Sequence, residues 1–532
     1  MAPIRALFGN AVTMALEGNF MDASELRQVP DNQEVLLGQD SNVSVILEVL
    51  QQVEPGTSPD DMDRAVRYHF DSIANDNDAT DVHVTWVDVA AGDAPAGKTP
   101  QPALLQGTQR VKKFGKPADN DLVHIWVAVW RLPSKKVDLA LSLNEPSDAD
   151  TDAIAQRFRA SAGSLRIPAE HRSALTPTTA KKLIENGFEI TVERDPQRIF
   201  DDAEFEAWPK APKATPIIGL KELDTPGPDL ENTHIQFAHC YKNQEGWVDV
   251  LGRFKRGGGK LYDLEFLEDA QGRRVAAFGW HAGFAGAALG LLGLAEQLNG
   301  GKLGAQTKFD NEDALLKETS KAVENIRKHR ADGKATALVI GALGRCGRGA
   351  VSCFERSGMK PEEIVRWDLQ ETSAKSGPYQ EILDVDIFVN CIYLRSKIPN
   401  FIDTAFINQA GANRRLGMVV DVSCDTTNPN NPLPVYSINT TFDKPTVDVE
   451  LAKGVPKMEV ISIDHLPTLL PREASEAFSD DLLPSLLQLP FVTGAAGEDA
   501  LKHTHEEGKG AVWTRAEKLF RKHLADAVAH GA

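Results

Sequence analysis

Apolar and polar residues alternate with a period of two through the first third of the chain. Three stretches with this alternation predict strands: residues 82–87, 123–130 and 137–143. Residues 4–8 and 11–16 predict a hairpin that turns at Gly9-Asn10. Helical spacing over residues 59–75, entered through Ser58, and over 148–161 predicts two helices. Together these elements predict a mostly antiparallel sheet covered by helices.

Beyond residue 170, helical segments follow short apolar runs, as is typical of an α/β fold. The pattern predicts a helix over residues 178–186 and strands over 189–193 and 217–222. The run of small apolar residues from Gly283 to Ala295 predicts a buried helix that packs closely through glycine and alanine. This run is too short to span a bilayer, so we expect no membrane segment.

A glycine-rich turn follows the apolar run Ala337 to Ile340 and precedes a helix over residues 350–357. A second predicted strand, residues 364–368, ends at Asp368. This order is that of a dinucleotide-binding unit, in which glycines admit a pyrophosphate and the acid binds a ribose hydroxyl. The acidic residue favours NAD over NADP. The glycine spacing, Gly-x-x-Gly-x-x-Gly, is looser than the usual motif, and a turn without a ligand is the alternative.

Charge and cysteine content narrow the class of protein. The chain of 532 residues is long enough for about two to four domains. Its net charge of −18 argues against a nucleic-acid partner. Residues 1–150 contain 23 acidic and 12 basic residues, an excess that suits a basic protein partner. The five cysteines show no metal-binding spacing, so we expect no metal site and a reducing, cytoplasmic location.

Four strings in the first domain carry a family resemblance: residues 7–9, 22–27, 29–35 and 105–109. They resemble the Ran guanine-nucleotide release factors over residues 4–160. The resemblance implies a PsbP-like α/β sandwich that binds the small GTPase Ran, and a location that extends to the nucleus. Within the string Val29-Pro30-Asp31-x-Gln33-Glu34-Val35, the GTPase-binding residues are implied to be Asp31 and Glu34. The alternative for this charged segment is a solvated loop.

Several residues suited to acid–base chemistry end predicted strands in the second part of the chain. Lys221 and Glu222 end the strand over residues 217–222, and His239 and Lys242 end the run over 234–242. Lone residues of these types are usually structural. Because the carboxyl ends of strands in one α/β domain meet at one edge, the group together favours a functional site.

Longer strings, within residues 165–525, are similar to saccharopine dehydrogenase of the NAD-dependent, lysine-forming type. They are residues 235–244, 261–268, 272–279, 341–347, 420–423, 425–429 and 463–467. The family implies two Rossmann-like domains with a cleft between them. We expect a release-factor-like domain over 1–163, a substrate domain over 164–283 completed by 466–532, and an NAD-binding domain over 284–465.

The implied reaction cleaves saccharopine with NAD⁺ and water to lysine, 2-oxoglutarate and NADH, the last step of the fungal-type 2-aminoadipate pathway. Hydride leaves the glutamate-side carbon, and the resulting imine is hydrolysed. Lys221 matches the family's proton acceptor and His239 its acid–base histidine; Glu222 and Glu265 match acids that tune the pKa values of these two.

The remaining site residues follow from the same resemblance. The substrate contacts are Arg172, Gln244, Arg274 and Phe278, and a substrate with three carboxylates requires guanidinium groups. The NAD contacts are Arg273, Gly344, Arg345, Asp368, Thr372, Tyr393, Val422 and Asp464. Cys346 and Cys391 match two cysteines on the cofactor side, either bridged or, as a reducing cytosol favours, as two free thiols.

Two segments are shorter than in the saccharopine dehydrogenases. The entry at Ser164 to Pro168 lacks the family's first lysine and has little room for its first strand, and Phe205 to Lys213 is also compressed. Such losses expose a sheet edge. An alternative function is therefore a Ran-binding transport factor with a non-catalytic dehydrogenase part. A further alternative is that two neighbouring reading frames have been joined near Ser164.

Overall fold

The computed structural model divides into two compact units, residues 1–169 with 195–197, and residues 170–194 with 198–532. It describes the whole chain except residues 1–3, 8–11, 26–28, 31, 54–57, 90–98, 113–119, 133–136, 146–150, 166–170, 194–197, 206–215, 224–226, 244–245, 395, 425–427 and 494–507.

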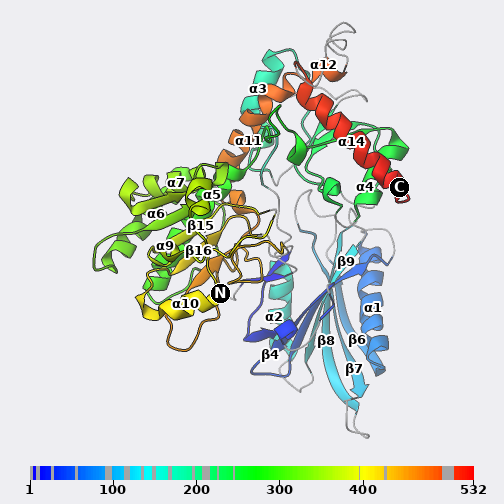
Figure 1. Cartoon of the computed structure of the whole chain (residues 1–532). Helices are drawn as coiled ribbons and strands as arrows, with labels where there is room; N and C mark the ends of the chain where they lie inside the picture. The colour runs from blue at the N-terminus through cyan, green and yellow to red at the C-terminus, as the bar shows by residue number, and fades with distance from the viewer. Residues whose placement is uncertain are drawn as a thin grey trace. The chain divides into compact units, whose positions relative to one another are not determined.

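The first unit is an antiparallel sheet of seven strands in the order β3-β4-β5-β9-β8-β7-β6 (Figure 1). The strands are β3 (Phe20–Asp22), β4 (Gln33–Gly38), β5 (Ser44–Gln51), β6 (Thr80–Val89), β7 (Ala103–Lys112), β8 (Asn120–Leu132) and β9 (Val137–Glu145). The predicted hairpin is formed by β1 (Ile4–Leu7) and β2 (Val12–Ala15), and the predicted helices are α1 (Pro59–Asp76) and α2 (Thr151–Ser164). The expected antiparallel sheet with helices is confirmed.

The alternation along β8 determines which helix covers which face. Ile125, Val127 and Val129 share a buried cluster with residues of α1, including Phe70. Trp126, Ala128 and Trp130 point the other way, into a cluster with α2. Because both faces of β8 are covered, the tryptophans serve as core residues. Ser58 caps α1 through a capping box with Asp61, as its position before the helix predicts.

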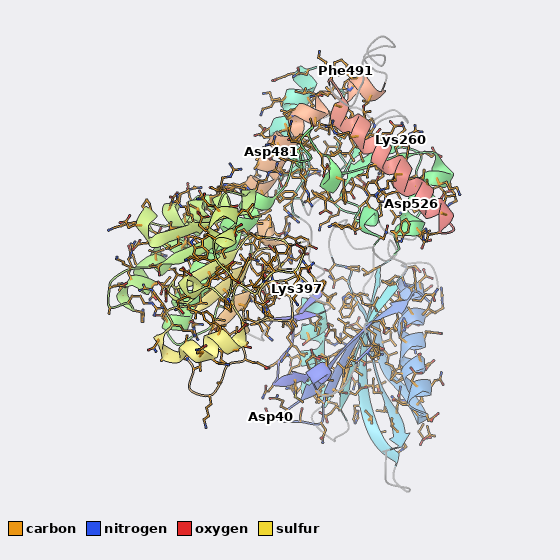
Figure 2. The ribbon with its side chains drawn as sticks, in the orientation of Figure 1. Asp40, Lys260, Lys397, Asp481, Phe491 and Asp526 are labelled. Atoms are coloured by element: carbon orange, nitrogen blue, oxygen red, sulfur yellow. The ribbon has the colours of Figure 1, made fainter. Side chains whose placement is uncertain are left out.

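The second unit contains two parallel sheets. The first has the order β10 (Ile217–Ile218), β11 (Thr233–Gln236) and β12 (Lys260–Asp263). Helices α3 (Pro177–Glu185), α4 (Trp247–Gly257), α11 (Pro471–Leu486), α12 (Pro490–Thr493) and α14 (Ala511–Ala529) accompany it. The late helix α14 belongs to this early sheet, since Lys260 on β12 pairs with Glu517 of α14 at 3.0 Å. Figure 2 labels Lys260 beside α14.

Two predicted strands differ from the structure. Residues 189–193 form no strand, and only the first two residues of the segment 217–222 do, as β10. Among the described residues β10 pairs with β11 alone, and Ile217 at this edge is 43% exposed. The prediction was wrong because an apolar residue in a short segment can pack as part of an irregular loop, as Ile190 does against the cluster around Leu183.

The second sheet has the order β14-β13-β15-β16-β18-β17. Its parallel strands are β14 (Ile364–Trp367), β13 (Ala337–Ile340), β15 (Ile387–Asn390), β16 (Met418–Asp421) and β18 (Glu459–Ile461), and β17 (Val447–Asp448) runs antiparallel. Its helices are α5 (Gly279–Leu298), α6 (Glu312–Lys328), α7 (Arg345–Arg356), α8 (Leu369–Ser373), α9 (Gln380–Leu383) and α10 (Thr404–Ala410). The neighbours of β13 are β14 on one side and β15 on the other, so its carboxyl end is a switch point where ligands bind.

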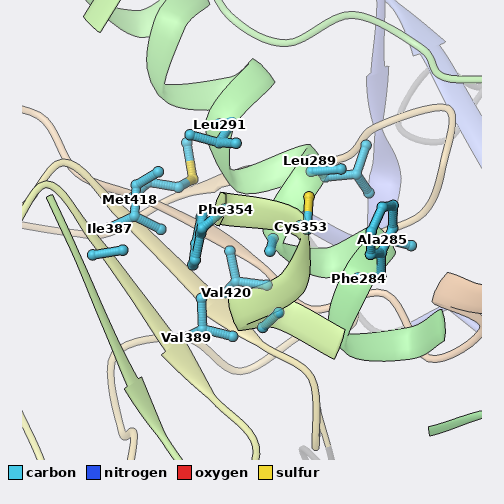
Figure 3. Packing of buried hydrophobic residues seen from close by; sticks show 14 of the residues in the cluster. Phe284, Ala285, Leu289, Leu291, Cys353, Phe354, Ile387, Val389, Met418 and Val420 are labelled. Carbon is cyan, nitrogen blue, oxygen red and sulfur yellow. The ribbon is translucent and has the colours of Figure 1, made fainter. Parts of the chain in front are cut away.

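The predicted buried helix over 283–295 is the middle of α5, and its glycines let it approach neighbouring elements closely. Figure 3 shows this core, with Phe284 and Leu291 of α5, Phe354 of α7 and Met418 of β16. A second cluster, around Phe388 and Phe401, covers the opposite face of the sheet. No helix in the described part of the chain is long and apolar enough to cross a membrane.

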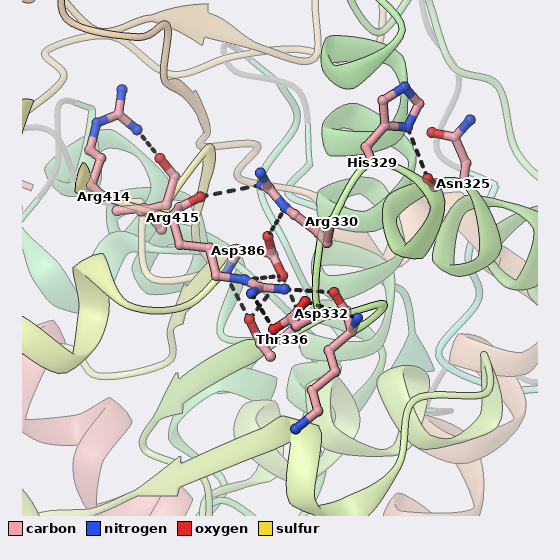
Figure 4. Close-up of polar contacts among 10 residues, drawn as sticks. Asn325, His329, Arg330, Asp332, Thr336, Asp386, Arg414 and Arg415 are labelled. Atoms are coloured by element: carbon pink, nitrogen blue, oxygen red, sulfur yellow. Dashed lines mark hydrogen bonds and ion pairs between the residues drawn. The ribbon is translucent and has the colours of Figure 1, made fainter. Parts of the chain in front are cut away.

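A buried carboxylate ties the amino ends of β13 and β15 together. Asp386 is fully buried and accepts hydrogen bonds from Arg330 at 2.6 Å, Arg415 at 2.9 Å and the Thr336 amide at 2.8 Å (Figure 4). The two guanidinium groups are about one-fifth exposed. This end of the sheet lies opposite the carboxyl ends where ligands bind, so the network serves stability.

We expect Asp386→Ala to lower the unfolding free energy of the second unit by about 3–5 kcal/mol, because it removes the buried carboxylate that Arg330 and Arg415 share. Urea unfolding followed by tryptophan fluorescence measures the change. Asp332→Ala is the matched control, since it removes the solvent-exposed partner of Arg415 and should change the midpoint little. Equal effects of the two substitutions would show that the buried network contributes no special stability.

Candidate active site

A close-packed turn at the carboxyl end of β13 has the features of a phosphate-binding loop. Gly341 has φ +84°, which a side chain rarely adopts, and Gly344 caps the start of α7. A Cβ atom on Gly347 would lie 2.1 Å from the carbonyl oxygen of Gly341. Only glycine therefore permits this close approach of helix to strand, and the N-terminus of α7 faces the turn with its amide groups.

Asp368 follows β14 and lies against this turn. Its two carboxylate oxygens accept the amides of Leu343 and Leu369, each at 2.9 Å. Each oxygen retains a second acceptor position, so the carboxylate can hold the turn and still accept a hydrogen bond from a hydroxyl group. The structure thus joins Gly344 and Asp368, as predicted for a dinucleotide site.

The other predicted cofactor residues lie in varied surroundings. The side chain of Arg345 donates to the carbonyl of Arg274 at 2.6 Å, which links α7 to the segment after β12. Arg273 is mostly exposed and pairs with Asp269 at 2.8 Å, and Thr372 donates to the carbonyl of Asp368 at 2.9 Å. Tyr393 lines a small cavity beside β15 and β16, Val422 follows β16 with its amide 2.9 Å from the Asn390 carbonyl, and Asp464 is exposed.

His239 lies in a tight turn directly after β11. It has φ +51°, and Asn243 at the end of the turn has φ +56°, a conformation that is costly for both residues. Three bonds to the neighbouring strand and its end hold the turn. The Ala238 amide donates to Asp263 at 3.3 Å, the Tyr241 hydroxyl donates to the Leu261 carbonyl at 2.8 Å, and Lys242 donates to Glu265 at 3.0 Å. The turn is therefore preorganised rather than loose.

Two acids set the electrostatics around His239. A hydrogen bond to Glu222 raises the pKa of His239, against the opposing effect of burial, and the charge of Glu265 adds to the rise. Burial alone would raise the pKa of Glu265, but the Lys242 hydrogen bond and the Arg274 guanidinium, 2.5 Å away, hold it below its ordinary value. Burial raises the pKa of Asp263 to about 6.

Lys221 follows the edge strand β10 on the same side as His239. The Phe237 amide donates to the Leu220 carbonyl at 3.1 Å, which aligns the two chains, and Glu222 next to Lys221 contacts the imidazole. Lys221 itself is exposed. The carboxyl ends of β10, β11 and β12 therefore gather Lys221, Glu222, His239, Glu265 and Arg274 into one region.

An aromatic group adjoins this region. The rings of Phe278 and Phe478 stack with centroids 4.4 Å apart, and the Arg172 guanidinium lies 4.6 Å from the centroid of Phe278. Phe237 connects this stack to His239, whose ring is 6.5 Å away. Arg172 and Phe278, both predicted substrate contacts, thus lie together.

The remaining predicted residues lie outside the described residues or away from this region. Gln244 and Asp31 lie outside the described residues. Glu34 lies on β4 and is half-buried. Cys346 and Cys391 are free thiols, and burial raises the pKa of both. The structure therefore shows no bridge between these two cysteines.

Sequence reasoning missed three residues that shape the site. Lys242, at the end of a predicted strand, donates a hydrogen bond to Glu265. Asp263 accepts the amides of both Ala238 and Glu265, so it fixes the segments that carry His239 and Glu265. The acid at the end of the strand over 260–263 was a signal for it. Phe478 lies on α11, far along the chain from the strands that carry the site, and nothing local indicates it.

Known proteins match both parts of the chain. The family described as Ran-interacting Mog1 protein matches residues 5–146, and the N-terminal domain of the alanine dehydrogenase/PNT family matches residues 166–285. The "Saccharopine dehydrogenase [NAD(+), L-lysine-forming]" of Yarrowia lipolytica is 53% identical over 67% of this chain and 95% of its own length. That of Schizosaccharomyces pombe is 52% identical over 66% and 95%. The chain belongs to the lysine-forming saccharopine dehydrogenase family. Its first unit is similar to the S. pombe "Nuclear import protein mog1", with 41% identity over 26% of this chain and 75% of that protein.

The residues present fit the NAD of a saccharopine dehydrogenase. In the glycine turn a Cβ on Gly347 or Gly341 would meet backbone atoms within 3.3 Å, so only glycine lets the start of α7 pack this closely on the end of β13, as a dinucleotide-binding turn requires. Asp368 at the end of β14 is an acid suited to a ribose hydroxyl, as NAD requires. The expected α/β fold of a Mog1-type unit followed by a Rossmann-like dehydrogenase is confirmed; the PsbP-like description of the first unit stays a prediction.

Proposed function

We propose that this saccharopine dehydrogenase cleaves saccharopine with NAD⁺ and water to lysine and 2-oxoglutarate. The observation that carries the proposal is the gathering of His239, Glu222, Glu265 and Arg274 at one sheet edge, joined through the Arg274–Arg345 contact to the glycine turn. When bound along Gly344, Arg345 and Asp368, NAD⁺ supplies the hydride acceptor. Thr372, Tyr393, Val422, Arg273 and Asp464 are the further proposed contacts.

In this proposal Lys221 accepts the proton of the substrate's secondary ammonium, which must leave before that nitrogen's carbon is oxidised. His239 takes a proton from the attacking water and returns one to the leaving amine, a task that suits an imidazole. Glu222 stabilises the imidazolium through its hydrogen bond. Glu265 orients Arg274 and Lys242, while Arg172 and Arg274 bind substrate carboxylates and Phe278 and Gln244 line the substrate.

The direct assay is lysine-dependent oxidation of NADH in the presence of 2-oxoglutarate, using the full chain. We expect turnover that requires all three compounds, with Lys221→Met at background. A folded protein without turnover would favour the alternative, in which the dehydrogenase part is not catalytic. Detection of one native polypeptide of 58.0 kDa would dismiss a chance joining of two reading frames.

The first unit has a separate proposed function, binding of the GTPase Ran in the cytoplasm and nucleus. Its similarity to the Mog1 proteins and the acidic excess of residues 1–150 support it. We expect the full chain to accelerate nucleotide release from purified Ran, and the double variant Asp31→Ala, Glu34→Ala to lose this effect while its NADH oxidation is unchanged. Equal release by variant and wild type would contradict this role of the two acids.

A further inference from the structure

Arg172, which lies over the ring of Phe278 and is proposed to bind a substrate carboxylate, belongs to a segment without regular secondary structure. Residues 171–176 form neither helix nor strand, and α3 begins only at Pro177. A guanidinium group recognises a carboxylate through a planar fork, so its orientation must be fixed. A loop does this less well than a helix or strand. The position of Arg172 therefore depends on what this segment contacts.

Helix α11 holds the backbone that follows this arginine. The amide of Ser173 donates to the hydroxyl of Ser475 at 2.9 Å, and that hydroxyl donates to a carbonyl one turn back in the helix at 2.6 Å. Ser479, one turn further along α11, accepts the amide of Thr176 at 3.3 Å. Both serine side chains of α11 are completely buried. Because they are four residues apart, they lie on one face of the helix and hold one stretch of chain.

Arg472 ties the backbone that precedes position 172 to the same helix. The carbonyl of His171 accepts the amide of Ile199 at 2.9 Å, and the carbonyl of Ile199 accepts from Nη2 of Arg472 at 3.2 Å. The same guanidinium group donates to both carboxylate oxygens of Glu204, at 2.7 and 2.9 Å, and lies 4.6 Å from the ring centroid of Phe200. These contacts fix the orientation of Arg472, so the link to His171 is rigid.

Helix α11 also supplies the aromatic ring behind the arginine. Phe478 stacks on Phe278, and the guanidinium group of Arg172 lies over the ring of Phe278. One helix from the end of the chain thus contacts the segment before Arg172, the segment after it and the ring beneath it. We propose that α11 positions Arg172 for the substrate carboxylate, with Arg472 and Ser475 as the positioning residues. This inference rests on the proposed function.

Loss of the Arg472 fork tests the proposal. We expect Arg472→Met to raise the KM for saccharopine about 10-fold and to leave the KM for NAD⁺ and kcat within about twofold, because Arg172 contacts the substrate alone. Arg472→Lys should recover only part of the affinity, since an ammonium group pairs with Glu204 as a point charge and does not reproduce the fork.

Lys182→Met is the matched control for Arg472→Met. It breaks another ion pair between the early segment and α11, at 2.9 Å from Asp480, on the far side of α3 from position 172. The two cationic side chains are exposed to similar extents, 45% for Lys182 and 40% for Arg472. We expect the control to change neither KM nor kcat.

A double-mutant cycle with Arg172→Ala separates positioning from a general loss of structure. We expect Arg472→Met to have no further effect on the KM for saccharopine in the Arg172→Ala protein, because the group that it positions is then absent. A structural defect would raise this KM by the same factor in both backgrounds and would overturn the inference. Ser475→Ala, which removes the acceptor of the Ser173 amide, repeats the cycle if Arg472→Met does not fold.

The outcomes separate the two proposals. Wild-type protein that is folded and inactive overturns the proposed function and this inference with it. Active wild type with an unchanged KM for saccharopine in both Arg472→Met and Ser475→Ala overturns the inference alone. An unchanged KM in Arg172→Ala would also overturn it, since Arg172 would then bind no substrate carboxylate.

Discussion

His239→Gln is expected to turn over saccharopine about 10²–10⁴-fold more slowly than the wild type, with the KM for NAD⁺ unchanged. Glutamine keeps hydrogen-bonding capacity in a side chain of similar reach, but it cannot take up and release a proton near neutral pH. The tight turn around His239 is held by Asp263, Leu261 and Glu265 rather than by the imidazole, so the variant should fold. Initial rates of NADH formation at saturating substrate concentrations measure the change.

Glu222→Gln is the companion variant and has a signature in the pH profile. The hydrogen bond to Glu222 raises the pKa of His239, so the neutral imidazole is populated only at higher pH in the wild type. Without the carboxylate the pKa falls, and the rising limb of the rate should move to lower pH. The stabilising effect of the raised pKa is fully present below about pH 6.5 and is lost as pH rises through the folded-state pKa, so the variant should lose stability mainly in acid. A pH–rate profile whose rising limb does not move would contradict a role of Glu222 in raising the pKa of His239.

Gly283→Ala is expected to lower the unfolding free energy of the second unit by about 1–3 kcal/mol or more and to weaken NADH binding. A Cβ atom at this position would lie 1.8 Å from the carbonyl oxygen of Cys346, in the first turn of α7. The contact is reciprocal, because a Cβ on Gly349 would lie 1.9 Å from the carbonyl of Trp280 on α5. The two helices must therefore separate, and the separation displaces the start of α7 at the glycine turn.

Thermal unfolding and NADH fluorescence titration measure the two effects of Gly283→Ala. Gly304→Ala is the matched control, since that glycine is exposed and a Cβ there would meet nothing within 4 Å. A Gly283→Ala protein that melts with the wild type and binds NADH equally well would contradict the role given to this helix contact.

Local sequence predicts those elements whose own residues show which of their faces are buried. The alternation over β8 reflects two faces that are each covered by a helix, and the small residues of α5 reflect its close contact with α7. The glycine turn and Asp368 were also predictable, because the phosphate-binding geometry requires glycines at fixed positions between a strand and a helix. The family resemblance supplied the roles of Lys221 and His239, which spacing alone leaves open.

The remaining features depend on contacts between distant segments. The edge strand β10 ends after two residues, although the apolar pattern continues to Leu220 and backbone hydrogen bonds still join Gly219 to Ile235 at 3.0 Å and Phe237 to Leu220 at 3.1 Å. Its length depends on this pairing with a later segment, which local sequence does not show. The stack of Phe278 on Phe478 joins the residue before α5 to a residue of α11, and no local pattern connects the two.

We infer that the full chain oxidatively cleaves saccharopine with Lys221 and His239 as its proton-transfer groups. The most direct measurement is the amount of lysine, 2-oxoglutarate and NADH formed from saccharopine and NAD⁺, determined for the wild type and for Lys221→Met, His239→Gln. We expect equal molar amounts of the three products from the wild type and background amounts from the double variant. Wild-type levels of product from the folded double variant would contradict it.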